Sequence, residues 1–237
     1  MKSTKNKSAA GFSLVELLIV LTVIAILSGI IGYYLTYHRT AYKPDDQALL
    51  IVDILQEARQ RSLTQREVLR VEIDIVDNII RLIDENEPGT EDDDRMIRQL
   101  ALADVNEVKV EERPAEIFDN PPETLPVPSA NFKPSIYPPS TPHRVCTLRF
   151  LSNGTVVDAG NSPTGTNAVP TGTTLHVWSP NKVNADESDI ARAITITGTT
   201  GSVRLWEYNR ASTATNKWMD SRRTGAFGGG GGTTATP

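Results

Sequence analysis

Residues 11–37 read GFSLVELLIVLTVIAILSGIIGYYLTY, and the interpretation of the whole chain starts from them. The last 21 of these residues, 17–37, carry no charged side chain. A helix of that length spans about 30 Å at ~1.5 Å per residue, which matches the hydrocarbon thickness of a bilayer. Apolar residues occur on every side of this helix, so it requires lipid or other helices all around it. The stretch therefore predicts a membrane-spanning helix.

The ten residues before this stretch, MKSTKNKSAA, contain Lys2, Lys5 and Lys7 and no acid. Positive charge before a membrane helix retains the N-terminus in the cytoplasm, so the rest of the chain is expected on the other side of the membrane. An ordinary signal peptide has a shorter apolar core followed by its cleavage site. Here the apolar run is longer and the cleavage-like residues precede it. A plain anchor leaves Glu16 unexplained, because a carboxylate at the centre of a membrane helix costs up to about 2.5–3.5 kcal/mol.

Residues 11–16, GFSLVE, follow a short basic leader and precede about 20 apolar residues. This arrangement resembles the processing and methylation motif of type IV prepilins and type II secretion pseudopilins. The resemblance implies that a prepilin peptidase cleaves between Gly11 and Phe12 and that Phe12 is N-methylated. It also implies an assembly role for Glu16, whose carboxylate would meet the new amine of Phe12 on a neighbouring subunit. The implied partners are the peptidase, other pilin-like subunits and the inner-membrane assembly platform.

Beyond the apolar helix the hydrophobic pattern changes twice. Ala48, Ile51, Val52, Leu55, Ala58 and Ser62 recur at helical spacing and predict a helical face packed on a sheet. From residue 69 the spacing becomes two, and the pattern predicts hairpins at 69–83, 145–157 and 193–208 with further strands at 106–111 and 175–178. The fold class predicted is α+β, with a long N-terminal helix packed on antiparallel sheet.

The expected organisation has five parts along the chain. Nine of the fifteen prolines fall in residues 113–143, which we interpret as a long insertion in the β-rich domain. The C-terminal end is rich in Gly and Thr and is expected to be flexible. The parts are a cleaved leader 1–11, a transmembrane or filament-core helix 12–37, a distal amphipathic helix 38–65, a periplasmic β-rich domain 66–223 and a flexible tail 224–237.

A helix followed by a hairpin and an all-β remainder is similar to the GspH/FimT subclass of minor pilins and pseudopilins. The similarity rests on Leu55, on residues 57–59, 71–74 and 150–154 (FLSNG), and on residues 194–203 (ITITGTTGSV). It implies a structural role in a type II secretion pseudopilus or a type IV pilus. The sequence does not distinguish these machines.

Two other functions stay open. FimT-like minor pilins bind DNA through a basic C-terminal region, which makes Arg222 and Arg223 the candidate DNA contacts here. The formal net charge of −5 argues against nucleic acid, since such affinity comes largely from Lys and Arg. Loss of the three leader lysines would lower it further, to −8. An adhesive tip subunit, binding through the insertion, is the second alternative.

No catalytic residue, cofactor or metal site is expected. The chain contains none of the G-x-S-x-G, P-loop or H-E-x-x-H motifs, and His38, His143 and His176 are dispersed. The single cysteine, Cys146, lies in an apolar strand and is interpreted as a core residue. The acidic loop at residues 84–94 could supply oxygen ligands to calcium, but it lacks the alternating spacing of an EF-hand, so a solvated loop is favoured.

Overall fold

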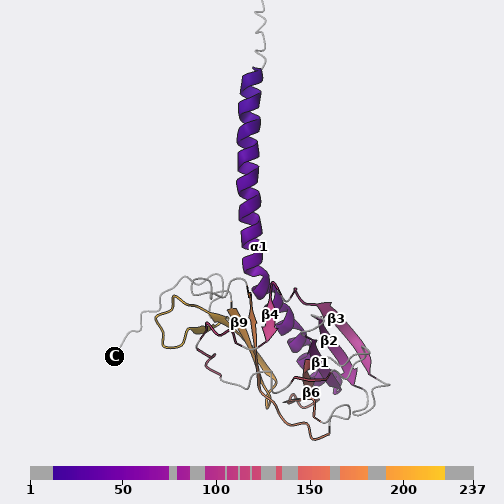
Figure 1. Ribbon diagram of the computed structural model, residues 1–237. Helices are drawn as coiled ribbons and strands as arrows, with labels where there is room; N and C mark the ends of the chain where they lie inside the picture. Colours follow the sequence, from indigo (N-terminus) through magenta and orange to yellow (C-terminus); the bar gives the residue numbers. More distant parts are fainter. Residues whose placement is uncertain are drawn as a thin grey trace, which may run out of the picture. The chain divides into compact units, whose positions relative to one another are not determined.

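The computed structural model describes residues 13–74, 79–85, 94–104, 106–111, 113–117, 119–123, 132–134, 144–160, 166–180 and 191–221 (Figure 1). The chain divides into two compact units, Met1–Ala41 and Tyr42–Pro237. The first unit contains the apolar part of the helix, and the second contains all the strands. Each unit is described by itself below.

Helix α1 comprises Leu14–Gln65 and so contributes residues to both units. In the second unit its buried face includes Ala48, Ile51, Leu55, Ala58 and Ser62, each with no exposed surface. This result confirms the predicted amphipathic face, with Ile54 buried in addition and Val52 only half-buried. The helix ends after Gln65 because Arg66 takes a left-handed conformation, with φ of 60°, at the position where helices commonly stop.

The strands form two antiparallel sheets. The first, sheet A, has the order β3-β2-β1-β6-β5, with β7 also paired to β6. The second, sheet B, has the order β11-β10-β9-β8-β4. The strands of sheet A are β1 (Val68–Asp74), β2 (Ile79–Glu85), β3 (Arg95–Ala101), β5 (Phe132–Pro134), β6 (Arg144–Phe150) and β7 (Val156–Val157). Those of sheet B are β4 (Lys109–Glu111), β8 (Thr173–Trp178), β9 (Ala191–Thr197), β10 (Ser202–Tyr208) and β11 (Trp218–Asp220).

The buried face of α1 packs on both sheets in one hydrophobic cluster. From sheet A the cluster takes the alternate residues Leu69, Val71 and Ile73 of β1, and from sheet B it takes Leu175 and Val177 of β8. The α+β fold with a long N-terminal helix on antiparallel sheet is therefore confirmed. The predicted strands are present, but they form two sheets, and β3, β5 and β11 were not predicted.

Two turns join sheet A to sheet B beside the helix. Val156 of β7 donates its amide to the carbonyl of Gly198 at 2.7 Å. Gly201, in the β9–β10 turn, has a φ of 60°, and a Cβ at this residue would lie 2.5 Å from the carbonyl oxygen of Gly154. Only glycine fits this position, because both the conformation and the approach of the two backbones exclude a side chain.

The first part of the proline-rich segment packs across the outer face of sheet B. Ile117 is fully buried in a second hydrophobic cluster with Trp206, Tyr208 and Trp218. Trp218 Nε1 also donates to the carbonyl of Asp119 at 2.8 Å. Residues 113–117 and 119–123 thus cover this face. The middle of the predicted insertion lies mostly outside the described residues, apart from β5.

Candidate functional site

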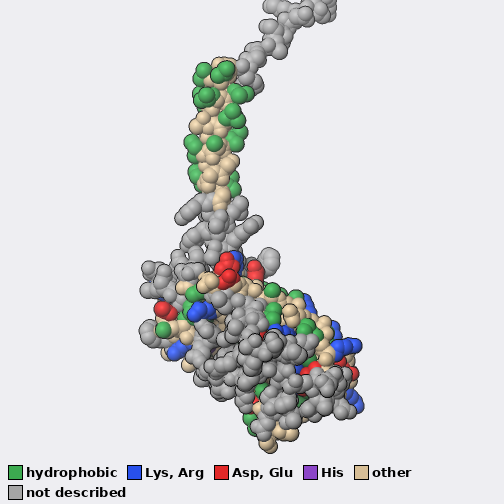
Figure 2. Space-filling view, turned by 45° about the vertical axis from the view of Figure 1, so that its right-hand side comes forward, with side chains coloured by type: hydrophobic (Ala, Val, Ile, Leu, Met, Phe, Trp, Pro, Cys, Tyr) green, Lys and Arg blue, Asp and Glu red, His purple; other side chains and the backbone are tan. Residues whose placement is uncertain are grey.

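The first part of α1, Leu14–Gly32, exposes apolar side chains along its whole length. Its mean hydropathy is 2.8 and none of it is buried. The exposed fraction of its large apolar side chains runs from 49% at Val23 to 80% at Leu14. Figure 2 shows hydrophobic side chains along this part of the helix. By length and composition this is a helix that can cross a membrane. A surface this apolar is unfavourable in water, so it requires lipid or other apolar helices as its surroundings.

Glu16 is the one charged residue within Leu14–Gly32. It lies in the first turn of α1, where the positive end of the helix dipole favours a carboxylate. Its side chain is exposed and makes no ion pair or hydrogen bond in the structure as described. The carboxylate is therefore available to a cation from another molecule. Gly11 and Phe12, the predicted cleavage and methylation residues, lie outside the described residues.

Two of the titratable side chains that were considered for chemistry, Cys146 and His176, are buried in the second unit. Burial raises the pKa of Cys146 to about 12, which leaves the thiol protonated and unreactive. Burial, with a smaller contribution from Arg113, lowers the pKa of His176 to about 4. Both ring nitrogens of His176 are buried and have no hydrogen-bond partner among the residues that the structure describes. Among the described residues, no group of three or more His, Cys, Asp or Glu side chains is placed to hold a metal ion.

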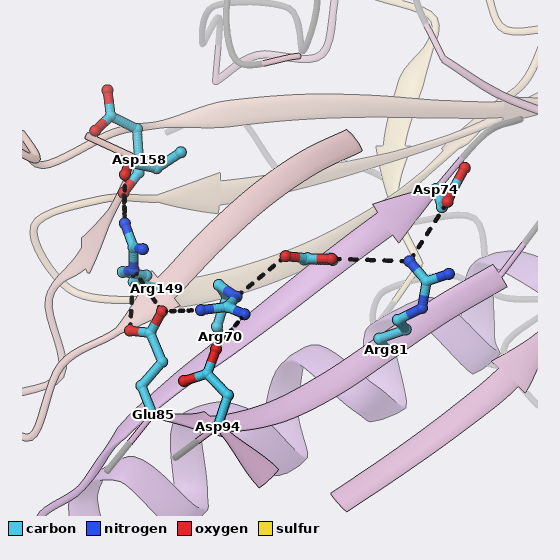
Figure 3. A network of polar contacts seen from close by, with 9 residues as sticks. Arg70, Asp74, Arg81, Glu85, Asp94, Arg149 and Asp158 are labelled. Carbon is cyan, nitrogen blue, oxygen red and sulfur yellow. Dashed lines mark hydrogen bonds and ion pairs between the residues drawn. The ribbon is translucent and has the colours of Figure 1, made fainter. Parts of the chain in front are cut away.

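An ionic network on the outer face of sheet A was not predicted. Arg70 of β1 and Arg149 of β6 lie opposite each other in the strand register, and both contact Glu85, the last residue of β2 (Figure 3). Arg149 Nε donates to both Glu85 carboxylate oxygens at 2.9 Å. Further along the face, Arg81 Nη1 lies 3.4 Å from Asp74 Oδ2. All these side chains are nearly inaccessible to solvent.

Arg70 contacts three acids in this network, Glu72, Glu85 and Asp94. Burial lowers the pKa of its guanidinium, but the charges of Glu85, Glu72 and Asp94 outweigh burial, so the pKa of Arg70 is raised above its usual value. Arg70 is thus a permanent cation among carboxylates. Sequence reasoning missed it because alternation along a strand shows which residues share a face and not what covers that face.

The structure describes Asp84, Glu85 and Asp94 of the predicted acidic loop. Glu85 and Asp94, near its two ends, contact Arg70. Asp84 points to the other face of the sheet and lines a polar cleft of about 290 Å³ with Arg61 and Arg95. Residues 86–93 lie outside the described residues, as do His143, Arg222 and Arg223. For His38, the structure describes the backbone within α1 and not the side chain.

Comparison with known proteins gave two findings. A family model described as the prokaryotic N-terminal methylation motif matches residues 6–32. A solved structure, the minor pseudopilin EpsH from the Type 2 Secretion System of Vibrio cholerae, is similar at 15% identity and a TM-score of 0.38, covering 69% of this chain and 95% of that chain. No curated protein matches. The match to the family model is limited to residues 6–32.

Proposed function

We propose that this chain, a pilin-type protein by its N-terminal methylation motif, is a minor subunit of a type II secretion pseudopilus or a type IV pilus. The more specific GspH/FimT subclass is supported by the element order of one long helix followed by antiparallel strands. The role is structural. The subunit is first held in the inner membrane by Leu14–Gly32, with its β-rich unit in the periplasm, and then joins a filament.

Processing prepares the helix for assembly. Cleavage between Gly11 and Phe12 removes the three leader lysines and creates a new amine at Phe12, which is then methylated. The methylated amine keeps a positive charge, so it can meet a carboxylate in apolar surroundings. An ion pair of this kind specifies register more reliably than it adds stability.

One observation carries this proposal. Glu16 is the single charge on a helix segment whose other side chains are exposed and almost entirely apolar, and its own chain supplies no partner among the described residues. When such segments bundle, a buried carboxylate without a cation is strongly unfavourable. A neighbour's N-terminal amine removes that penalty, so the pairing favours one axial position of each subunit.

The test follows the chain through processing and assembly in its host. Glu16→Gln keeps the size of the side chain and removes its charge. We expect normal cleavage, seen as the mature N-terminus by mass spectrometry, and loss of the subunit from the sheared filament fraction. The matched control is Glu67→Gln, an exposed acid just after α1, which should assemble normally. Full incorporation of Glu16→Gln would refute the pairing.

A binding assay with the purified chain distinguishes the DNA-binding alternative from the structural proposal. If the chain takes up DNA, its purified form should be retained on duplex DNA at low salt, and changing Arg222 and Arg223 together to Ala should abolish retention. The structural proposal expects no retention by either form.

A further inference from the structure

The guanidinium of Arg70 contacts three carboxylates at once. Its Nε lies 3.1 Å from Glu72 Oε1, its Nη2 lies 2.7 Å from Asp94 Oδ2, and its Nη1 donates to Glu85 Oε1. The four side chains are at most 5% exposed. Each nitrogen of the guanidinium thus faces a different acid in a site shielded from water (Figure 3).

These three acids come from different parts of the chain. Glu72 is two residues along β1 from Arg70, Glu85 ends β2, and Asp94 directly precedes β3. Glu85 and Asp94 therefore bracket the connection from β2 to β3. Arg70 ties together the two ends of that connection, and Arg149 holds Glu85 from the other side.

We propose that Arg70 is a built-in cation that joins Glu85 at the end of β2 to Asp94 at the start of β3, and that it takes the place of a metal ion between the carboxylates of Glu72, Glu85 and Asp94. Buried carboxylates that converge on one point require a positive charge. In other acidic loops a hard divalent cation supplies it through oxygen ligands. Here the guanidinium supplies it, and its planar fork of five donors can serve several carboxylates in fixed directions. The inference goes beyond the assembly role and concerns how the β-rich unit holds its shape.

The same geometry explains why lysine is a poor substitute. An ammonium is a compact charge on a flexible stem and lacks the rigid fork of the guanidinium, so it is a poor match for three carboxylates from three segments. The strand β3 also lies at the edge of sheet A, where, among the described residues, it pairs with β2 alone. Loss of the contact at Asp94 therefore removes an attachment at the start of β3, beyond which the strand is held by its pairing with β2 and by the packing of Ile97 on the core.

Hydrogen exchange of the full chain in detergent micelles tests the proposal. The readout is the exchange rate of amides in the peptide 94–101, measured by mass spectrometry. For the wild type we expect the same rate in EDTA and in millimolar calcium. In Arg70→Met, which keeps much of the bulk and removes the charge, exchange should be about tenfold faster because the strand opens locally more often.

The matched control is Arg98→Met. Arg98, in β3 itself, also bridges two carboxylates, Asp53 and Glu57, but its side chain is 40% exposed. Its replacement should change the exchange rate far less. If Arg70→Met does not fold, Arg70→Lys replaces it, with faster exchange again expected. Slower exchange of the wild type in calcium than in EDTA, or equal effects at Arg70 and Arg98, would overturn the proposal.

Discussion

Replacement of Glu85 by Gln should destabilise the β-rich unit more than replacement of any exposed acid. Glu85 is 3% exposed in its side chain and accepts hydrogen bonds from both Arg70 and Arg149. Gln keeps the shape but removes the charge, so two buried guanidinium groups lose their shared anion. Removal of one partner of a buried ion pair costs about 3–5 kcal/mol. We expect a loss of unfolding free energy in that range.

The expected loss is large on the scale of a whole domain, whose stability is about 5–15 kcal/mol. It can be measured by urea unfolding of the full chain in detergent micelles, followed by tryptophan fluorescence. Trp206 and Trp218 are buried in the second cluster and report on the same unit. The midpoint should fall while the slope with urea stays constant, since the native surface area is unchanged.

Glu107→Gln provides the matched control. Glu107 also pairs with a cation, Lys43, but the two side chains are 42% and 35% exposed. Exposed ion pairs contribute about 0–1 kcal/mol, so this change should be nearly silent. If Glu85→Gln lost no more stability than Glu107→Gln, the buried network would not stabilise the fold as described.

Two further predictions concern the second unit. Gly201→Ala should lower the unfolding free energy by at least about 1 kcal/mol in the same assay, because the residue has a positive φ and its Cβ would clash with the Gly154 carbonyl. An unchanged urea midpoint would contradict the close approach of the two turns. Folding lowers the pKa of His176 to about 4, because burial disfavours the charged imidazole. The unfolded chain therefore binds a proton more readily, and the free energy of unfolding should fall as the pH is lowered from about 6.5 to about 4, by up to about 3 kcal/mol. His176→Leu should flatten this pH dependence of the urea midpoint, and an unaltered slope would exclude His176 as its cause.

Local patterns were sufficient for much of the fold. In an apolar medium, an uncharged stretch of 21 residues can satisfy its backbone hydrogen bonds only as a helix. Residues 17–37 were therefore predicted to be helical without any tertiary information. The amphipathic face from Ala48 to Ser62 and the hairpins of β1–β2 and β9–β10 likewise follow from spacing between near neighbours. Glu16 was singled out by the same local reasoning, because a charge in an apolar run stands out.

Long-range pairing determined what spacing could not. The alternation in β1 predicted that Arg70, Glu72 and Asp74 share a face, but nothing near them in sequence indicated that this face would be buried. That depends on β6, some 70 residues later, which pairs with β1 and places Arg149 opposite Arg70. The burial of this face also depends on Asp94, which directly precedes β3 and contacts Arg70. The charged network exists only because these distant segments meet, since no single segment carries enough opposite charge to offset its own burial.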